Sequence, residues 1–335
     1  MANDLIIETN ELTKSYGPHV ALDKLSIQVE RGATGLLGPN GAGKSTFFKT
    51  ILGLIQATSG EGKVLGHDIR TDGLAIRSKI GYMPEYDALD EHMDAIHQVR
   101  YSGELLGMNP VVAMSRAHTA MEYVGLGELR YRPISSFSTG MKQATKLACS
   151  IIHDPQLTIA DEPSNGLDAD SREAMLVTLS NMVHAGNRSV LMASHLMDDV
   201  ERVCQNIVLL HKGKLAAQGR IEDLKAIDRE IEIHVWGMAG ELEQALGKEG
   251  LEVRREGRMM RIRHDGEKTT HRILKCAAET GAQIRRMHEY EASLEDLFIV
   301  IMERFGYGVK SSEDLLASPA EARKVDAPES MGGSG

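Results

Sequence analysis

The sequence predicts an α/β protein: a larger domain with a β subdomain and an all-helical subdomain, then a smaller α+β domain. Three observations support this fold class. A strand, a glycine-rich turn and a helix start follow one another around residue 38. Helical periodicity without strand signals fills about residues 86–150, and a β-α-β-β-α-β order, the split βαβ pattern, follows from residue 230. We therefore expect domains at 1–225 and 226–309, with a disordered tail at 310–335.

The glycine-rich turn matches the phosphate-loop pattern G-x-x-x-x-G-K-[ST] through Gly38, Gly43, Lys44 and Ser45. Loop amides and the following helix N-terminus donate to phosphate oxygens. Lys44 would place its charge on the β- and γ-phosphates, and the Ser45 hydroxyl would reach a magnesium ion. We therefore expect a P-loop NTPase fold that binds ATP and Mg²⁺. The expected nucleotide-binding residues of this loop are Gly38, Pro39, Asn40, Gly41, Ala42, Gly43, Lys44, Ser45 and Thr46.

Composition limits the classes of protein to which the chain can belong. Its 335 residues, 26% charged and 4% aromatic, are typical of a soluble globular protein with more than one core. The net charge of -10 argues against nucleic-acid binding, which relies on neutralising phosphates. Cys149, Cys204 and Cys276 lack metal-site spacing and indicate buried thiols in a reducing compartment. We expect no signal peptide, and the apolar run Leu297–Met302 is too short to span a membrane.

The segment before the phosphate loop predicts strands at Leu5–Glu8 and Leu25–Val29, joined through a turn at Ser15–Pro18. Tyr16 in that turn either packs incidentally or stacks on adenine, and its place ahead of a phosphate loop favours stacking. After the loop we expect a helix over Phe47–Leu54. A strand from Ile80 then ends at a proline and Glu85.

The all-helical subdomain shows apolar residues at three- and four-residue spacing. We expect helices at Asp94–Leu106, Val111–Val124 and Leu126–Tyr131. An insert of this kind between two parts of an α/β sheet would form a lobe that moves as a unit.

Carboxylates follow the next buried strand. Gln156–Ala160 is mostly apolar and delivers Asp161 and Glu162 to its carboxyl end, the edge where open α/β sheets bind ligands. Asp161 can hold Mg²⁺ through water, and Glu162 can polarise the water that attacks the γ-phosphate. A strand at Ser189–Ser194 ends at His195, which either caps the following helix or faces the same phosphates.

The order of these motifs resembles that of the ATP-binding-cassette (ABC) ATPases. The matching segments lie within about residues 5–225 and are Tyr16, Gly38–Thr46, Ile80–Glu85, Ser138–Gln143, Leu157–Pro163, Asn165–Asp168 and His195. The resemblance implies that Lys44, Glu162 and His195 are catalytic and that Ser45, Asp161 and Glu85 surround the metal. It also implies a head-to-tail dimer in which Ser138 and Gly140 close over the ATP of a second subunit.

Two departures from the family pattern narrow the resemblance. The family's Leu-Ser-Gly-Gly-Gln is replaced by Phe137-Ser138-Thr139-Gly140-Met141, and the glutamine after the strand proline is Glu85. Met141-Lys142-Gln143 and Glu85 are similar to the exporter branch, whose ATPase subunits are separate chains from their membrane permeases. The resemblance therefore implies a cytoplasmic subunit held at the inner face of the plasma membrane by transmembrane permease subunits. Glu85 can ligate magnesium or accept from water, but it adds negative charge beside an anionic nucleotide.

The smaller domain predicts strands at Glu230–Trp236, Leu251–Arg255, Met259–Arg263 and Ile284–His288, with helices at Glu241–Leu246 and Thr270–Glu279. A helix over Leu297–Phe305 starts at a capping-box-like Ser293. The local basic cluster predicts a solvated face balanced by glutamates rather than a nucleic-acid or lipid patch, and consists of Arg254, Arg255, Arg258, Arg261 and Arg263.

Two alternatives to the function of an ABC exporter subunit remain open. One is a soluble ABC ATPase acting on nucleic acid or the ribosome, although such chains usually carry two cassettes or a long coiled-coil insertion. The other is a dimer clamp that barely hydrolyses ATP; Glu162 and His195 argue against it, whereas Glu85 is compatible with it.

Overall fold

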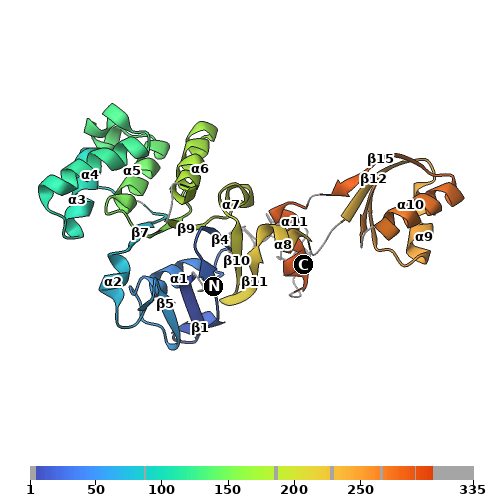
Figure 1. Cartoon of the computed structure of the whole chain (residues 1–335), viewed down its shortest axis with the longest axis horizontal. Coiled ribbons are helices and arrows are strands. Elements are labelled where there is room, and N and C mark those ends of the chain that lie inside the picture. Colours follow the sequence, from blue (N-terminus) through green and yellow to red (C-terminus); the bar gives the residue numbers. More distant parts are fainter. Residues whose placement is uncertain are drawn as a thin grey trace, which may run out of the picture. The chain divides into compact units, whose positions relative to one another are not determined.

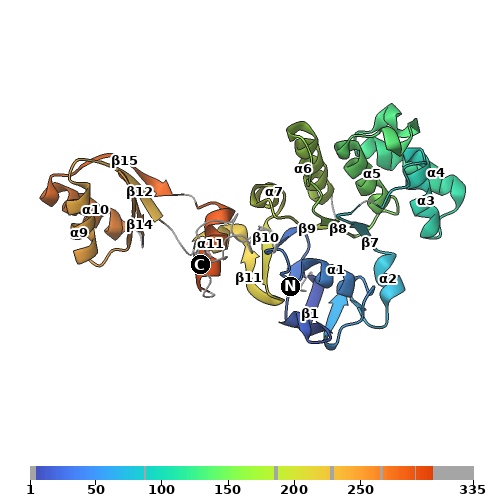
Figure 2. The ribbon, with the colours of Figure 1, turned by 180° about the vertical axis from the view of Figure 1, so that it is seen from behind.

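The computed structural model describes residues 5–86, 88–184, 188–226, 230–264, 267–290 and 292–304. The chain divides into two compact units, with Gly219 at the end of the first and Arg220 at the start of the second (Figures 1 and 2). The predicted tail at 310–335 and the predicted helix end at Phe305 lie outside the described residues.

A mainly parallel sheet forms the centre of the first unit. Its strand order is β11-β10-β4-β9-β8-β7, and neighbours from β10 to β7 pair in parallel. The strands are β4 (Ala33–Leu37), β7 (Ile80–Met83), β8 (Leu157–Asp161), β9 (Ser189–Ala193), β10 (Asn206–His211) and β11 (Lys214–Arg220). Because parallel strands end at one edge, the segments after β4, β7, β8 and β9 meet there.

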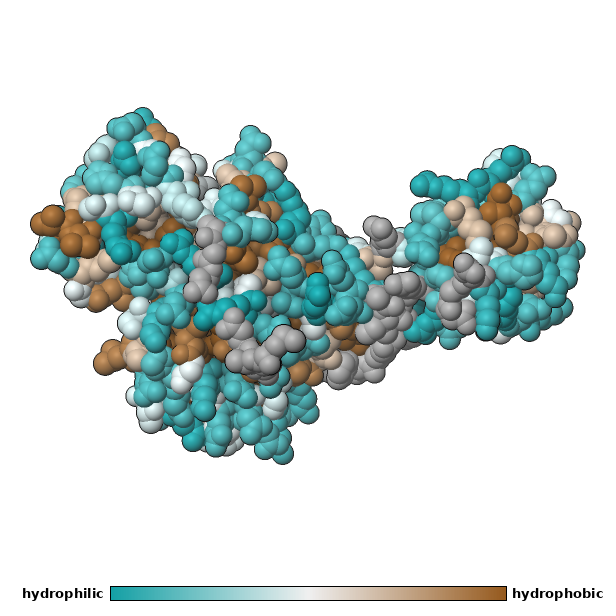
Figure 3. Space-filling model, in the orientation of Figure 1, coloured by the Kyte–Doolittle hydropathy of each residue, from teal (hydrophilic) through white to brown (hydrophobic). Residues whose placement is uncertain are grey.

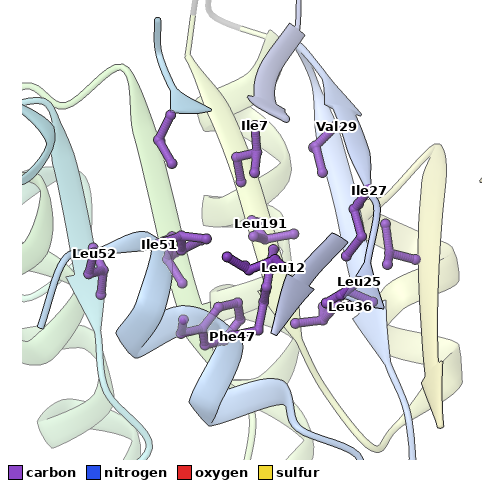
Figure 4. Close-up of a cluster of buried hydrophobic side chains, with 14 of the residues drawn as sticks. Ile7, Leu12, Leu25, Ile27, Val29, Leu36, Phe47, Ile51, Leu52 and Leu191 are labelled. Atoms are coloured by element: carbon purple, nitrogen blue, oxygen red, sulfur yellow. The ribbon is translucent and has the colours of Figure 1, made fainter. Parts of the chain in front are cut away.

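An antiparallel sheet covers one side of this core, with order β2-β1-β5-β6 and β3 paired to β1. The strands are β1 (Leu5–Tyr16), β2 (His19–Leu25), β3 (Gln28–Glu30), β5 (Ser59–Val64) and β6 (His67–Asp68). Helix α1 (Lys44–Ile51) is buried between the two sheets, where Phe47 and Ile51 pack against Leu36 and Leu191 on one side and Leu12 on the other (Figure 4).

The opposite face of the parallel sheet carries α6 (Ala169–His184) and α7 (Met197–Val203), as Figure 1 shows. Gly35 lets α7 approach β4 closely, because a β-carbon there would overlap the Val200 side chain. Helices on both faces and a parallel centre are the α/β architecture that the motifs predicted, so the predicted fold class is confirmed.

The predicted first strands were wrong in extent. β1 continues from Glu8 to Tyr16, and the predicted strand at Leu25–Val29 is divided between the end of β2 and β3. The continuation was missed because the Asn10–Lys14 segment is largely polar and lacks alternation, whereas ladders to β2 and β5 on both sides hold it extended. A hairpin turn at Gly17, with φ +58°, joins β1 to β2.

The helical subdomain has its own core, in which Ile96 and Val99 pack with Met121 and Ile152. Its elements are α3 (Ala95–Leu105), α4 (Pro110–Tyr123), the 3₁₀ turns η1 (Gly127–Tyr131) and η2 (Ile134–Ser136), and α5 (Thr139–Ile151). The short helix α2 (Gly73–Arg77) precedes this subdomain and packs beside β6 and β7, with Ile76 in the core of the sheets. The segment Leu126–Tyr131, predicted as an α-helix, is the short turn η1, because Gly125 and Gly127 both have positive φ and interrupt a regular helix.

The second unit contains an antiparallel sheet of order β13-β14-β12-β15. Its elements are α8 (Ile221–Ala226), β12 (Glu230–Trp236), α9 (Ala239–Lys248), β13 (Val253–Glu256), β14 (Met259–Arg263), α10 (Glu267–Thr280), β15 (Gln283–Tyr290) and α11 (Leu294–Arg304). The split βαβ order is the predicted one. Ser293 and Asp296 form the predicted cap, since the Asp296 amide donates to Ser293 Oγ at 3.1 Å.

The arginine cluster is partly neutralised within this unit. Arg255 pairs with Glu243 at 2.7 Å and Arg261 with Glu232 at 3.3 Å, while the Arg258 guanidinium lies 3.9 Å from the centroid of the Trp236 ring. Exposed apolar side chains are scattered over a mainly hydrophilic surface (Figure 3). Within the described ranges, every helix is too short or too polar to cross a membrane.

Candidate nucleotide-binding site

A pocket of about 400 Å³ opens where the parallel strands end. It is bounded by the loop after β4 together with the residues that follow β7, β8 and β9, so segments distant in the sequence meet at one edge of the sheet. Its lining residues are His19, Ala21, Pro39, Asn40, Gly41, Ala42, Gly43, Lys44, Ser45, Thr46, Glu85, Asp161, Glu162, Asn165 and His195.

Glycine is required at both ends of the phosphate loop. Gly43 has φ +107°, and a β-carbon there would lie 2.7 Å from the Ala21 carbonyl oxygen. Gly38 has φ +153°, and a β-carbon would overlap the Leu210 carbonyl. Gly38 is not among the described residues that line the pocket, and its close approach to Leu210 shapes the loop. The turn brings backbone amides and the N-terminus of α1 to one point, the arrangement that binds phosphate.

Lys44 lies at the base of this loop with only 9% of its surface exposed. Its Nζ donates to the Gly38 carbonyl at 2.7 Å, which holds the ammonium at the loop. Burial lowers the pKa of Lys44, and the nearby charges of Glu162, Asp161 and Glu85 oppose this shift. A buried ammonium facing acidic groups is suited to polyphosphate bridged to a divalent cation.

Asp161 carries the clearest electrostatic strain of the site. Burial raises its pKa to about 6, with further contributions from the charges of Glu162 and Glu85. The Tyr82 hydroxyl donates to Asp161 Oδ2 at 3.5 Å. Carboxylates that lie close together repel one another, which destabilises their charged forms unless a cation binds between them.

The donor set fits magnesium bound together with a nucleotide. Ser45 offers a hydroxyl, and Asp161 and Glu85 offer carboxylates in the same pocket. Within the described parts of the chain, no group of three or more histidine, cysteine or acidic side chains could hold a metal alone. Magnesium commonly takes one or two carboxylates and fills its remaining positions with water and substrate phosphates.

Glu162 and His195 form a dyad across the ends of β8 and β9. Glu162 Oε2 lies 2.7 Å from His195 Nδ1 and also accepts from the His195 amide at 3.3 Å. The hydrogen bond to Glu162 raises the pKa of His195 against the opposing effect of burial. Glu162 has φ +52°, an uncommon left-handed conformation for a non-glycine residue, and its amide donates to the Ala193 carbonyl at 2.9 Å. Such backbone strain is often found at functional sites.

Ser138 and Gly140 lie at the start of α5 and are not among the described residues that line this pocket. Ser138 is the N-cap of α5 and accepts from the Met141 amide at 3.3 Å. Its exposed position leaves the helix N-terminus open to another molecule. Gly140 packs against α6, where a β-carbon would overlap Ser171 Oγ.

Tyr16 is also not among the lining residues that the structure describes. It is 47% exposed at the end of β1, with the Lys14 ammonium 5.0 Å from its ring centroid. Its partner across the hairpin, His19, lines the pocket instead. Sequence reasoning did not identify His19, Ala21 or Asn165 as site residues. Asn165 lies two residues after the Asp161–Pro163 run, and that position could have indicated it.

Comparison with known proteins agrees with this geometry. Residues 22–165 match the family model described as ABC transporter. The probable multidrug ABC transporter ATP-binding protein YbhF of Escherichia coli K12 is 36% identical over 224 residues, which are 67% of this chain and 38% of YbhF. This chain thus spans less than half of that relative.

Another relative matches along nearly its whole length. The Nod factor export ATP-binding protein I of Cupriavidus metallidurans is 30% identical over 306 residues, covering 89% of this chain and 98% of the relative. A solved ATP-binding subunit of an ABC transporter superimposes with a TM-score of 0.60 at 28% identity, over 66% of this chain and 92% of that one. The chain therefore belongs to the ABC transporter family and is one of its ATPases.

Proposed function

We propose that this chain is the nucleotide-binding subunit of an ABC exporter and hydrolyses MgATP at the interface of a head-to-tail dimer. The observation that carries the proposal is the Glu162–His195 dyad, 2.7 Å apart, in the same pocket as Lys44 and the phosphate loop. A nucleotide-binding clamp without hydrolysis would need the loop and Lys44 alone.

The residues of the pocket divide the chemistry among them. Amides of the Gly41–Thr46 segment and the Lys44 ammonium bind the phosphates. Ser45, Asp161 and Glu85 would hold Mg²⁺, which when bound neutralises charge on the β- and γ-phosphates.

Glu162 orients the attacking water and accepts its proton. His195 donates to Glu162 from Nδ1 and thereby fixes the carboxylate. Its half-exposed ring leaves the other nitrogen free to face the transferred phosphoryl group.

The position of the helix-start residues supports the proposed dimer. Ser138 and Gly140 lie outside the pocket of their own subunit, and Ser138 is exposed at a helix N-terminus, where negative charge is stabilised. In a head-to-tail pair, this N-terminus would close over the γ-phosphate held by Lys44 of the second subunit. Each ATP would then be bound by both subunits.

A separate permease is the remaining part of the proposal. The relative that matches along nearly its whole length is named for export of a Nod factor. The resemblance to the exporter branch implies a membrane permease as a separate chain. The chain would act at the inner face of the plasma membrane, held there by its permease.

The proposal is tested by purifying the chain together with a candidate membrane permease and measuring ATPase activity in proteoliposomes. We expect MgATP hydrolysis that depends on Glu162 and changes when the permease is present. A matched control is Glu122→Gln, an exposed glutamate on α4. Activity that is equal in Glu162→Gln and in the parent chain would contradict the proposal.

A further inference from the structure

Asp199 is a fully buried carboxylate outside the nucleotide pocket. It lies in the first turn of α7 and is 0% exposed, whereas its neighbour Asp198 is exposed. Taking a carboxylate out of water costs several kcal/mol unless charged and hydrogen-bonding partners compensate it. The hydrogen-bond partners of Asp199 therefore indicate what this buried carboxylate does.

Those partners come from two other segments. Arg172 of α6 donates from Nε to Asp199 Oδ1 at 2.6 Å, and a terminal guanidinium nitrogen lies at the same distance. Ser164, buried in the turn after β8, donates from Oγ to Asp199 Oδ2. One carboxylate thus joins α6, α7 and the β8 turn through both of its oxygens.

The joined segments carry the two members of the catalytic dyad. Ser164 follows Glu162 by two residues, in a turn where the Asn165 amide donates to the Glu162 carbonyl at 3.2 Å. Asp199 follows His195 by four residues, and its own amide donates to the Leu196 carbonyl at 3.1 Å. Fixing Ser164 to Asp199 therefore fixes the backbone on which Glu162 lies relative to the backbone on which His195 lies.

We propose that Asp199 is a positioning residue for ATP hydrolysis, which holds the Ser164 turn and the start of α7 so that Glu162 and His195 keep their mutual geometry. This inference rests on the proposed function of the site. The alternative is an ion pair that only stabilises the fold, although buried ion pairs contribute little net stability. The two differ in what they change: a positioning residue affects turnover and leaves nucleotide affinity intact, because the phosphate loop does not touch Asp199.

The experiment compares Asp199→Asn and Ser164→Ala with Asp198→Asn, which removes an exposed charge from the same helix. For each full-length variant, kcat and KM for MgATP are measured, and ADP affinity is measured by titration calorimetry. We expect Asp199→Asn and Ser164→Ala to lower kcat between about tenfold and about a hundredfold, as small displacements of catalytic groups do. ADP affinity should stay within about twofold of the parent, the range expected when uniform binding is untouched. Asp198→Asn should match the parent chain.

Ser164→Ala leaves the Asp199–Arg172 pair in place, so it decides the question even where Asp199→Asn does not fold. A parent-like kcat in Ser164→Ala overturns the inference. A fall in kcat with a parallel loss of ADP affinity also overturns it, because the change is then structural. If the parent chain itself shows no ATPase activity, the proposed function fails and this inference fails with it.

Discussion

Replacing Glu162 by glutamine should convert this ATPase into a trapped dimer. The Glu162 side chain is 10% exposed, and its Oε2 lies 2.7 Å from His195 Nδ1, so an amide of the same shape fits with little rearrangement. Loss of a general base typically slows turnover by about 10²–10⁴, or about 3–5 kcal/mol of barrier. Removing a carboxylate beside Lys44 also reduces repulsion of the phosphates, which favours bound ATP.

The expected lifetime makes the trap visible by size-exclusion chromatography. At a typical turnover of about 1 s⁻¹, a roughly thousandfold loss leaves an ATP-bound dimer that lasts about 1,000 s, comparable with a column run. Glu162→Gln in MgATP should therefore elute as a dimer, while the parent chain elutes largely as a monomer. Adding Ser138→Arg should restore the monomer, because the bulky side chain would lie at the shared interface.

A matched control is Ser115→Arg, an equal change on the exposed face of α4, which should leave the trapped dimer intact. Ser138→Arg also removes the N-cap of α5, worth about 1 kcal/mol, so thermal unfolding is recorded for both variants. A monomeric Glu162→Gln at saturating ATP would refute the shared-site architecture. Hydrolysis at the parent rate would refute the general-base role of Glu162.

Other variants test the pocket residue by residue. Lys44→Ala should abolish ATPase activity and weaken ADP binding measured by calorimetry, whereas Lys49→Ala, an exposed lysine on the same helix, should do neither. Because Asp161 has a pKa of about 6 before metal binding, protons should compete with Mg²⁺ as the pH falls through 6. The Mg²⁺ activation constant should then rise by up to about tenfold per pH unit below that value, and a flat profile between pH 7 and 5 would contradict the assignment. Tyr16→Ala should raise the KM for ATP about fivefold, corresponding to about 1 kcal/mol of lost stacking; an unchanged KM would show that Tyr16 only packs on the surface.

Local patterns carried most of what the sequence predicted correctly. The phosphate loop is continuous in the chain, and its glycines and Lys44 have fixed spacing, so strand, turn and helix could be predicted from one segment. The second unit was predictable for a similar reason. Its short strands and helices follow one another closely, so each could be predicted from its own segment. For example, β12 spans the predicted Glu230–Trp236.

Long-range contacts were not predictable in the same way. The polar part of β1 is extended because β2 and β5 pair with it on both sides. These backbone pairings do not require apolar and polar residues to alternate, so the sequence of this segment does not show them. His19 reaches the pocket only because the β1–β2 hairpin projects toward the loop after β4. The contact of Asp199 with Ser164 joins residues 35 positions apart, and nothing local in α7 distinguishes Asp199 from Asp198.

The left-handed backbone at Glu162 has a consequence for engineering. A conformation of this kind costs a side chain of ordinary shape about 1–3 kcal/mol, and glycine adopts it without that cost. Glu162→Gly would relieve this strain, but it would also remove the carboxylate and the two hydrogen bonds that it accepts from His195. A library screened only for thermal resistance should therefore keep Glu162 fixed, because selection for relief of the strain acts directly against the residue that carries the chemistry.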